Sequence, residues 1–172
     1  TQRAFLDEDA IVRQNIVKYH MYLRVPLSPL TMEKLLQDSD RGVLLAALDR
    51  ISMNASQPRV ISEIERLSSH EDRGIRLKIV DVARDCNRYD SRYRSILRSM
   101  TEDKDAEVTS MAAVELARFG EKINSAVIER IKNYLLSSKG MSSQVTTILY
   151  AVSAMGADGI QVYKALTEHG SS

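Results

Sequence analysis

Asp40-Arg-Gly-Val43, Asp72-Arg-Gly-Ile75 and Asp105-Ala-Glu-Val108 decide the fold of this chain, because they mark a repeat. The three Asp residues lie 32 and then 33 positions apart. An Asp before a helix can accept a hydrogen bond from an unpaired N–H of the first turn, so each copy predicts a helix start. Apolar residues follow at helical spacing: Val43, Leu44, Ala47, Leu48 and Ile51; Ile75, Ile79, Val82, Ala83 and Cys86; Val108, Met111, Ala112, Leu116 and Phe119.

Another amphipathic stretch comes before each of these helices and ends in a short polar turn. The repeating unit is therefore predicted to be helix, turn, helix. One such pair cannot bury its own apolar stripe, so consecutive pairs are expected to stack. The predicted first helices cover residues 32–37, 60–68, 93–100 and 127–136. The fourth copy, residues 126–156, lacks the Asp and has its turn at Lys139-Gly140.

This pattern resembles the HEAT family of helical repeats, whose second helices tend to read Asp-x-x-Val-Arg-x-x-Ala-x-x-x-Leu. Asp105, Val108, Ala112 and Leu116 fit that pattern, and Asp72, Ile75 and Arg76 fit its beginning. The resemblance covers about residues 31–156. It implies an all-α fold, a right-handed α-solenoid of about four antiparallel helix pairs. It implies an architecture and no particular activity.

Two further helices are expected to cap the ends of the stack. Residues 7–24 carry an apolar stripe at Val12, Ile16, Tyr19 and Leu23, and the prolines within 25–30 should end that helix. The segment Gly156 to Gly159 should separate a last helix over 160–168. We therefore expect one repeat domain over 1–172, with a cap and linker at 1–30, repeats at 31–156, and a C-terminal cap and tail at 157–172.

The composition limits the possible classes of function. A net charge of +1 is too small for general attraction to nucleic acid or to an anionic membrane. Cys86 is the only cysteine, which excludes an intramolecular disulfide and a Cys-built metal site. No apolar run approaches the roughly 20 residues that span a bilayer. We expect a cytoplasmic protein that is not inserted in a membrane.

No motif for catalysis or for binding a cofactor is present in the sequence. It has no Gly-rich phosphate loop, no Gly-x-Ser-x-Gly turn and no pair of His residues on one helix face. We therefore expect no enzyme activity, cofactor or metal. Cys86 should be a small buried side chain. Asn54-Ala-Ser56 matches a glycosylation sequon, which matters only in a secreted chain.

Two sets of residues are candidates for binding a partner. By the resemblance, second helices line a concave groove, which implies Arg41, Asp49, Arg73, Arg76 and Arg84 as groove residues. The second set is the stretch 84–94, where arginines and tyrosines crowd one turn; its members are Arg84, Arg88, Tyr89, Arg92 and Arg94. Arginine forks beside aromatic rings suit carboxylate, phosphate or base contacts. The alternative is a solvated turn in which Asp85 and Asp90 partly neutralise the arginines.

We expect a non-catalytic scaffold or adaptor that binds a partner protein or peptide on its helical groove. An acidic protein is the first candidate, because residues 59–98 carry 10 Lys/Arg against 7 Asp/Glu. An acidic zone follows the basic one at 101–121. Self-association through these two zones is therefore a second possibility. Nucleic-acid binding through residues 84–98, like the backbone grip of HEAT-like DNA glycosylases, is the alternative. A third possibility is an enzyme whose substrate binds in the groove, but the sequence identifies no acid or base group for its reaction.

Overall fold

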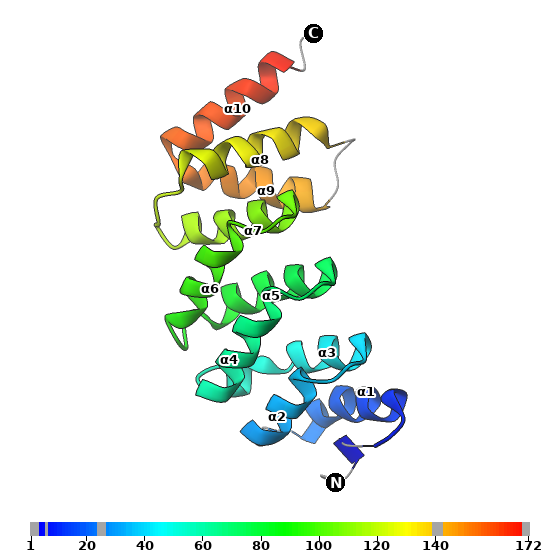
Figure 1. Cartoon of the computed structure of the whole chain (residues 1–172). Helices are drawn as coiled ribbons and strands as arrows, with labels where there is room; N and C mark the ends of the chain where they lie inside the picture. Colours follow the sequence, from blue (N-terminus) through cyan, green and yellow to red (C-terminus); the bar gives the residue numbers. More distant parts are fainter. Residues whose placement is uncertain (1–3, 6, 24–26, 139–142, 170–172) are drawn as a thin grey trace. The chain divides into compact units, whose positions relative to one another are not determined.

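The computed structural model describes residues 4–5, 7–23, 27–138 and 143–169, and every regular element in these ranges is a helix (Figure 1). The predicted all-α fold is therefore confirmed. The chain divides into two compact units, residues 1–93 and 94–172. The boundary falls in the first turn of α6 (Arg92–Met100).

The first unit contains two layers of helices. Helix α3 packs against α1 and α5 in one layer, while α2 packs against α4 in the other. The layers are joined because α2 lies against α3 and α4 lies against α5. The elements of this unit are α1 (Ala10–Tyr19), α2 (Pro29–Leu36), α3 (Arg41–Leu48), α4 (Pro58–Leu67) and α5 (Arg73–Cys86), with 3₁₀ turns at His20–Leu23 and Ile51–Asn54.

The second unit is built in the same way around α7. Helix α7 packs against both α8 and α9, and α10 packs mainly against α8 with a smaller contact on α9. Its elements are the rest of α6, α7 (Ala106–Arg118), α8 (Ser125–Ser137), α9 (Ser143–Val152), a 3₁₀ turn at Ser153–Met155 and α10 (Ala157–His169).

The repeated Asp residues begin their helices as predicted. The Oδ1 atoms of Asp40, Asp72 and Asp105 accept from the N–H groups of Val43, Ile75 and Val108 at 3.0, 3.1 and 3.2 Å. Each bond satisfies one of the donors that the first turn of a helix leaves unpaired. Asp103, two residues before this cap, in turn accepts from the Asp105 N–H at 2.8 Å.

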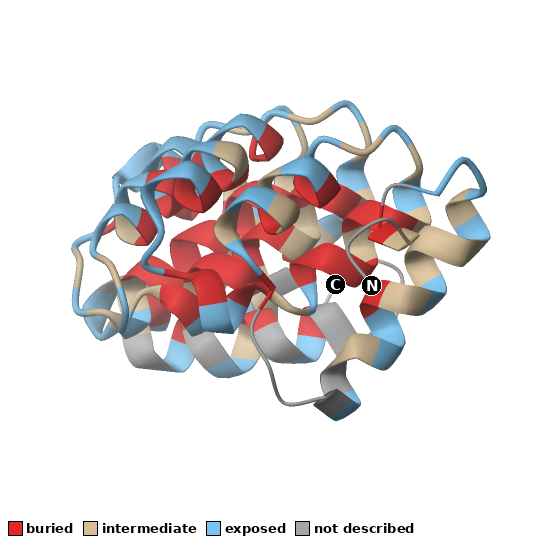
Figure 2. Cartoon of the chain, turned by 90° about the horizontal axis from the view of Figure 1, so that it is seen from below, coloured by how far each residue is buried: buried red, intermediate tan, exposed pale blue. Residues whose placement is uncertain are grey.

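The core contains the apolar residues that recur at the same place in successive second helices. Ala47, Ile79 and Ala112 all have 0% exposure. Buried residues lie on the sides of the helices that face other helices, whereas exposed residues occupy the outer sides and many turns (Figure 2). The predicted burial of these three residues is confirmed.

Three helix boundaries differ from the predictions. Pro29 does not lie in a linker but is the first residue of α2, where a proline has no N–H to leave unpaired and Ser28 supplies the cap. Ile51 lies in a 3₁₀ turn because α3 ends at Leu48. Gly159 does not separate helices but lies inside α10, where a Cβ would collide with the carbonyl oxygen of Val152. The predicted features at Arg24–Pro26 and Lys139-Gly140 lie outside the described residues.

Helix α1 begins in the same way as α3 and α5. Asp9 caps it by accepting from the Ile11 N–H at 2.8 Å. The predicted stripe is only partly covered: Val12 and Ile16 are half-buried and Tyr19 is 67% exposed, whereas Val17 is fully buried. The expected burial of Tyr19 is therefore wrong, because α1 turns Val17 toward its neighbours. The side chain of Leu23 is outside the described part.

Candidate functional site

The residues predicted to line a groove on α3 and α5 take part in ion pairs. Nε of Arg41 donates to Asp72 at 2.8 Å, and Nζ of Lys78 lies 2.5 Å from Asp49. Arg84 contacts both Asp81 and Asp85 at 2.9 Å. The side chains of Arg41, Asp49 and Asp85 are more than half exposed, so these ion pairs are accessible to solvent. Such pairs add about 0–1 kcal/mol each to stability.

Arg76 lies in a different environment from the other predicted groove residues. It is 3% exposed, and its Nη1 donates to the carbonyl oxygens of His70 and Glu71, both at 2.9 Å. These bonds hold the turn before α5. Arg73, at the start of the same helix, is exposed. Arg73 can therefore reach a partner at the surface, whereas Arg76 is enclosed by the fold.

The arginines of the 84–94 stretch are largely neutralised by nearby carboxylates. Nε and Nη2 of Arg92 donate to Asp90 at 3.0 and 2.8 Å, and the Arg92 side chain is the main cause that lowers the pKa of Asp90 to about 2. In the second unit, Arg94 lies 3.7 Å from Glu121 and its guanidinium is 5.4 Å from the centroid of the Phe119 ring. This pattern weighs against a continuous basic track for a polyanion.

Arg88 and Tyr89 are both exposed and lie in contact with each other. The guanidinium of Arg88 lies 4.8 Å from the centroid of the Tyr89 ring, and Tyr89 is 47% exposed. A cation held over an aromatic face at this distance is an attractive contact. The two side chains together present a charged group and a large apolar face to solvent.

Exposed apolar side chains also occur in the turns that follow α1, α3 and α5. Tyr22 follows α1, Met53 follows α3 and Tyr89 follows α5; their exposures are 73%, 60% and 47%. The C-terminal ends of α1, α3 and α5 lie at the same edge of this unit, on the left in Figure 1. We call these three residues the apolar turn row. The sequence search missed Tyr22 and Met53, although they lie 31 residues apart, the distance from Asp9 to Asp40.

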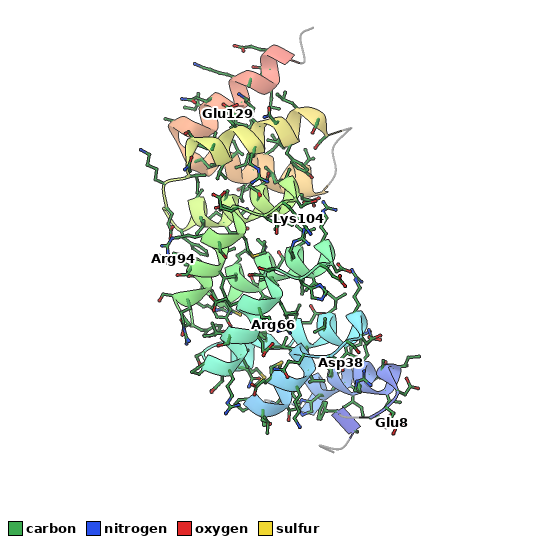
Figure 3. The ribbon with its side chains drawn as sticks, in the orientation of Figure 1. Glu8, Asp38, Arg66, Arg94, Lys104 and Glu129 are labelled. Atoms are coloured by element: carbon green, nitrogen blue, oxygen red, sulfur yellow. The ribbon has the colours of Figure 1, made fainter. Side chains whose placement is uncertain are left out.

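The opposite edge of the first unit carries carboxylates that stabilise the fold. Figure 3 shows Glu8 and Asp38 at this edge. Asp38 accepts from Nε and Nη2 of Arg13 at 2.7 and 2.8 Å, and it also accepts from the N–H of Asp40 at 2.8 Å. Asp38 thus stabilises a turn and Asp40 the start of a helix, so these carboxylates have a structural role.

The buried polar groups of the first unit also have structural roles. The Tyr93 hydroxyl donates to the Ala55 carbonyl oxygen at 2.9 Å. The neighbouring Cys86 is 0% exposed, which confirms that it is a small buried side chain. Burial raises the pKa of its thiol to about 11, so Cys86 is a poor nucleophile. Asn54 is 3% exposed, and its Nδ2 donates to the Leu27 carbonyl oxygen at 3.0 Å.

The second unit has an open hollow of about 330 Å³ beside the loop between α7 and α8. Glu121 and Lys122 are among the residues that line it. The Glu121 carboxylate accepts from Nε and Nη2 of Arg98 at 2.7 and 2.6 Å, so it is engaged within the fold. The described residues contain no group of three or more His, Cys, Asp or Glu placed to hold a metal ion. Nor is any described helix both long enough and apolar enough to pass through a bilayer.

Comparisons with known proteins leave the function to be argued from the residues themselves. No protein-family model matches the chain, and a search of curated proteins finds no match either.

Proposed function

We propose that this chain is a non-catalytic, cytoplasmic protein-interaction scaffold with a HEAT-like architecture. The repeat of Asp-capped second helices and the packing of α1, α3 and α5 in one layer support a right-handed α-solenoid of about four helix pairs. The partner is a protein that binds across successive turns of the first unit.

The apolar turn row carries this proposal. Single exposed apolar residues are common on protein surfaces and need no explanation. Here, however, a large apolar side chain recurs after each of three neighbouring second helices, with exposures of 73%, 60% and 47%. Large apolar and aromatic residues are the usual anchors of protein–protein contacts. A partner segment lying along this edge would cover all three.

The charges beside the row favour an acidic segment in the partner. Arg88 lies over the Tyr89 ring and is exposed, so it can meet a carboxylate next to an apolar contact. Asp81, Asp85 and Asp90 already engage the nearby Arg84 and Arg92. The attraction should therefore be local and modest, and it should decrease as salt rises.

Nucleic-acid binding is less well supported by the same residues. A duplex or single strand needs several cations along one track. In the stretch 84–98, Arg84, Arg92 and Arg98 are each held by a carboxylate of the same unit at 2.9 Å or less. Strong salt-dependent retention on DNA or RNA would favour this alternative.

The experiment is affinity capture with a variant that removes the row. Tyr22→Ser, Met53→Ser and Tyr89→Ser are combined, and proteins captured by the parent and by the variant are compared by quantitative mass spectrometry. We expect specific partners of the parent to lose at least about tenfold in affinity, which corresponds to about 1.4 kcal/mol. Circular dichroism should show unchanged helicity, because all three side chains are exposed.

The matched control removes two exposed apolar residues outside the row, Leu30→Ser on α2 and Tyr150→Ser on α9, whose exposures are 55% and 77%. The control should capture the same proteins as the parent. If the row variant keeps every specific partner, or if the control loses them equally, the row is not the binding surface.

A further inference from the structure

A side-chain acceptor recurs two residues before the Asp that caps each of α1, α3, α5 and α7. It accepts a hydrogen bond from the N–H of the capping Asp and so fixes the turn that leads into the helix. The donor and acceptor residues are Asp9 and Asp7 at 3.0 Å, Asp40 and Asp38 at 2.8 Å, Asp72 and His70 at 3.0 Å, and Asp105 and Asp103 at 2.8 Å. Three of these acceptors are carboxylate oxygens, whereas the acceptor in the turn before α5 is Nδ1 of an imidazole.

The sequence of α3 accounts for the imidazole in this turn. The carboxylate of Asp38 is also bound by Arg13, which lies four residues after the capping Asp of α1. The residue four positions after the capping Asp of α3 is Leu44, which is 3% exposed and cannot donate a hydrogen bond from its side chain. His70 is half-buried. Because burial of a charge without its ion-pair partner is unfavourable, a neutral acceptor suits this turn better than a carboxylate.

The hydrogen bond at His70 requires the neutral form of the ring. A neutral imidazole has one donor nitrogen and one acceptor nitrogen, whereas the protonated ring has two donors. Protonation of Nδ1 would therefore place a donor against the Asp72 N–H and break this bond. Asp72 in turn caps α5 by accepting from the Ile75 N–H at 3.1 Å, and it accepts from Nε of Arg41 on α3 at 2.8 Å. The turn at His70 thus positions a residue that joins α3 to α5.

The charged groups on this segment and on the elements beside it are of both signs. They are Glu71, Asp72, Arg73 and Arg76 on its own segment, Asp38, Asp40 and Arg41 at the start of α3, and Arg66 near the end of α4. Glu71 is exposed and Asp72 is already bound by Arg41, so water and this arginine weaken their attraction for a charged ring. Arg76 is 3% exposed, and its Nη1 donates to the His70 carbonyl oxygen at 2.9 Å. This buried cation disfavours a second positive charge on the same residue.

We propose that His70 makes the start of α5 sensitive to pH, because its imidazole takes up a proton only when it releases the Asp72 N–H. A histidine in an unfolded chain has a pKa of about 6.5, so the unfolded state binds this proton first as pH falls. The stabilisation is complete near about pH 7.5 and is lost as pH falls through about 6.5. One such proton can raise the equilibrium constant for unfolding by at most about tenfold between about pH 7.5 and 5.5. The carboxylates of the equivalent turns keep their charge in this range.

Urea unfolding of the parent and of His70→Asn at about pH 7.5 and 5.5 tests this proposal. Asparagine keeps an acceptor for the N–H two residues later and does not titrate. When the pH is lowered, the equilibrium constant for unfolding of the parent should rise at least about threefold more than that of the variant. His20 and His169 are present in both proteins, so the difference belongs to His70.

His70→Asp is a second variant, because it installs the acceptor of the equivalent turns and stays ionised above about pH 5. It should lose the same part of the pH dependence. Amide hydrogen exchange supplies a local measurement in the parent: protection of the Asp72 N–H should fall at least about threefold over this pH step, while that of the Asp40 N–H, which is bound to Asp38, should not. The proposal is overturned by an equal pH dependence in the parent and both variants, by a parent that becomes more stable in acid, or by an Asp72 N–H that keeps its protection.

Discussion

Arg13 and Arg76 donate equivalent hydrogen bonds from two different helices. Nη1 of Arg13 binds the carbonyl oxygens of Asp7 and Glu8 at 2.7 and 3.0 Å, and Nη1 of Arg76 binds those of His70 and Glu71 at 2.9 Å. In both cases the acceptors lie six and five residues before the arginine. Each arginine thus fastens the turn before its helix, and α1 and α5 are copies of one local structure.

Replacing Arg76 should therefore destabilise the fold. In Arg76→Ala, the His70 and Glu71 carbonyl oxygens lose a charged donor inside a nearly closed site, and we expect the free energy of unfolding to fall by about 2–3 kcal/mol. Arg41→Ala is the comparison, because Arg41 is 59% exposed and its ion pair with Asp72 should contribute less than about 1 kcal/mol. Urea unfolding measures both. If both variants lost the same free energy of unfolding, the buried hydrogen bonds of Arg76 would contribute no more to stability than the exposed ion pair of Arg41.

Ala112→Asp should prevent stable folding of the second unit. Ala112 is 0% exposed on α7, which packs against both α8 and α9, so the new carboxylate would be buried at a helix contact. We expect a loss of more than about 4 kcal/mol. Ala126→Asp, at an exposed position in the first turn of α8, should change stability little. Thermal melts that match for both variants would refute the assigned register.

Two glycines that lie inside helices should respond differently to alanine. At Gly159 a Cβ would collide with the backbone carbonyl oxygen of Val152, so Gly159→Ala must move α10 and should cost about 1–3 kcal/mol. At Gly74 the nearest atom to a Cβ is Nη2 of Arg41, at 2.7 Å, which belongs to a flexible side chain and can move. The gain in helix propensity should then leave Gly74→Ala within about 1 kcal/mol of the parent. Chemical denaturation of both variants checks this contrast.

Acid should weaken the first unit through its paired aspartates. The side chain of Arg92 is the main cause that lowers the pKa of Asp90 to about 2, and the side chain of Arg41 lowers the pKa of Asp72. An aspartate in an unfolded chain has a pKa of about 4, so the unfolded state binds protons first as pH falls. This stabilisation is complete above about pH 4 and is lost toward about pH 2. Urea unfolding across that range should show the loss, and Asp90→Asn should make the dependence shallower.

The sequence allowed the helix pairs to be predicted because their causes are local. Asp40, Asp72 and Asp105 cap helices, and the apolar spacing after each Asp identifies the buried side, which Ala47, Ile79 and Ala112 confirm. Asp9-Ala-Ile-Val12-Arg13 carries the same signal 31 residues before Asp40. The start of α1 at Asp9 is therefore predictable from the sequence in the same way.

The remaining differences depend on neighbours that a single stretch of sequence does not specify. Tyr19 fits an apolar stripe, yet its burial requires another helix that the described chain does not place there. Arg92 looked available for a partner, but Asp90 two residues earlier folds back onto it with two hydrogen bonds. The sequence predicts a break between helices at Gly159, because the close approach of Gly159 to the Val152 carbonyl oxygen exists only in the folded chain.

The burial of Asn54 would affect folding of this chain in the secretory pathway. Its amide donates to the Leu27 carbonyl oxygen at 3.0 Å and the residue is 3% exposed, although Asn54-Ala-Ser56 has the acceptor sequence for an N-linked sugar. An oligosaccharide attached to the nascent chain would have to be enclosed between the 3₁₀ turn and the segment at Leu27, where there is no room for it. If the chain were sent through the secretory pathway, molecules modified at Asn54 would be unable to close the first unit and would be retained by quality control, while Asn54→Gln would remove the modification at the cost of a strained amide.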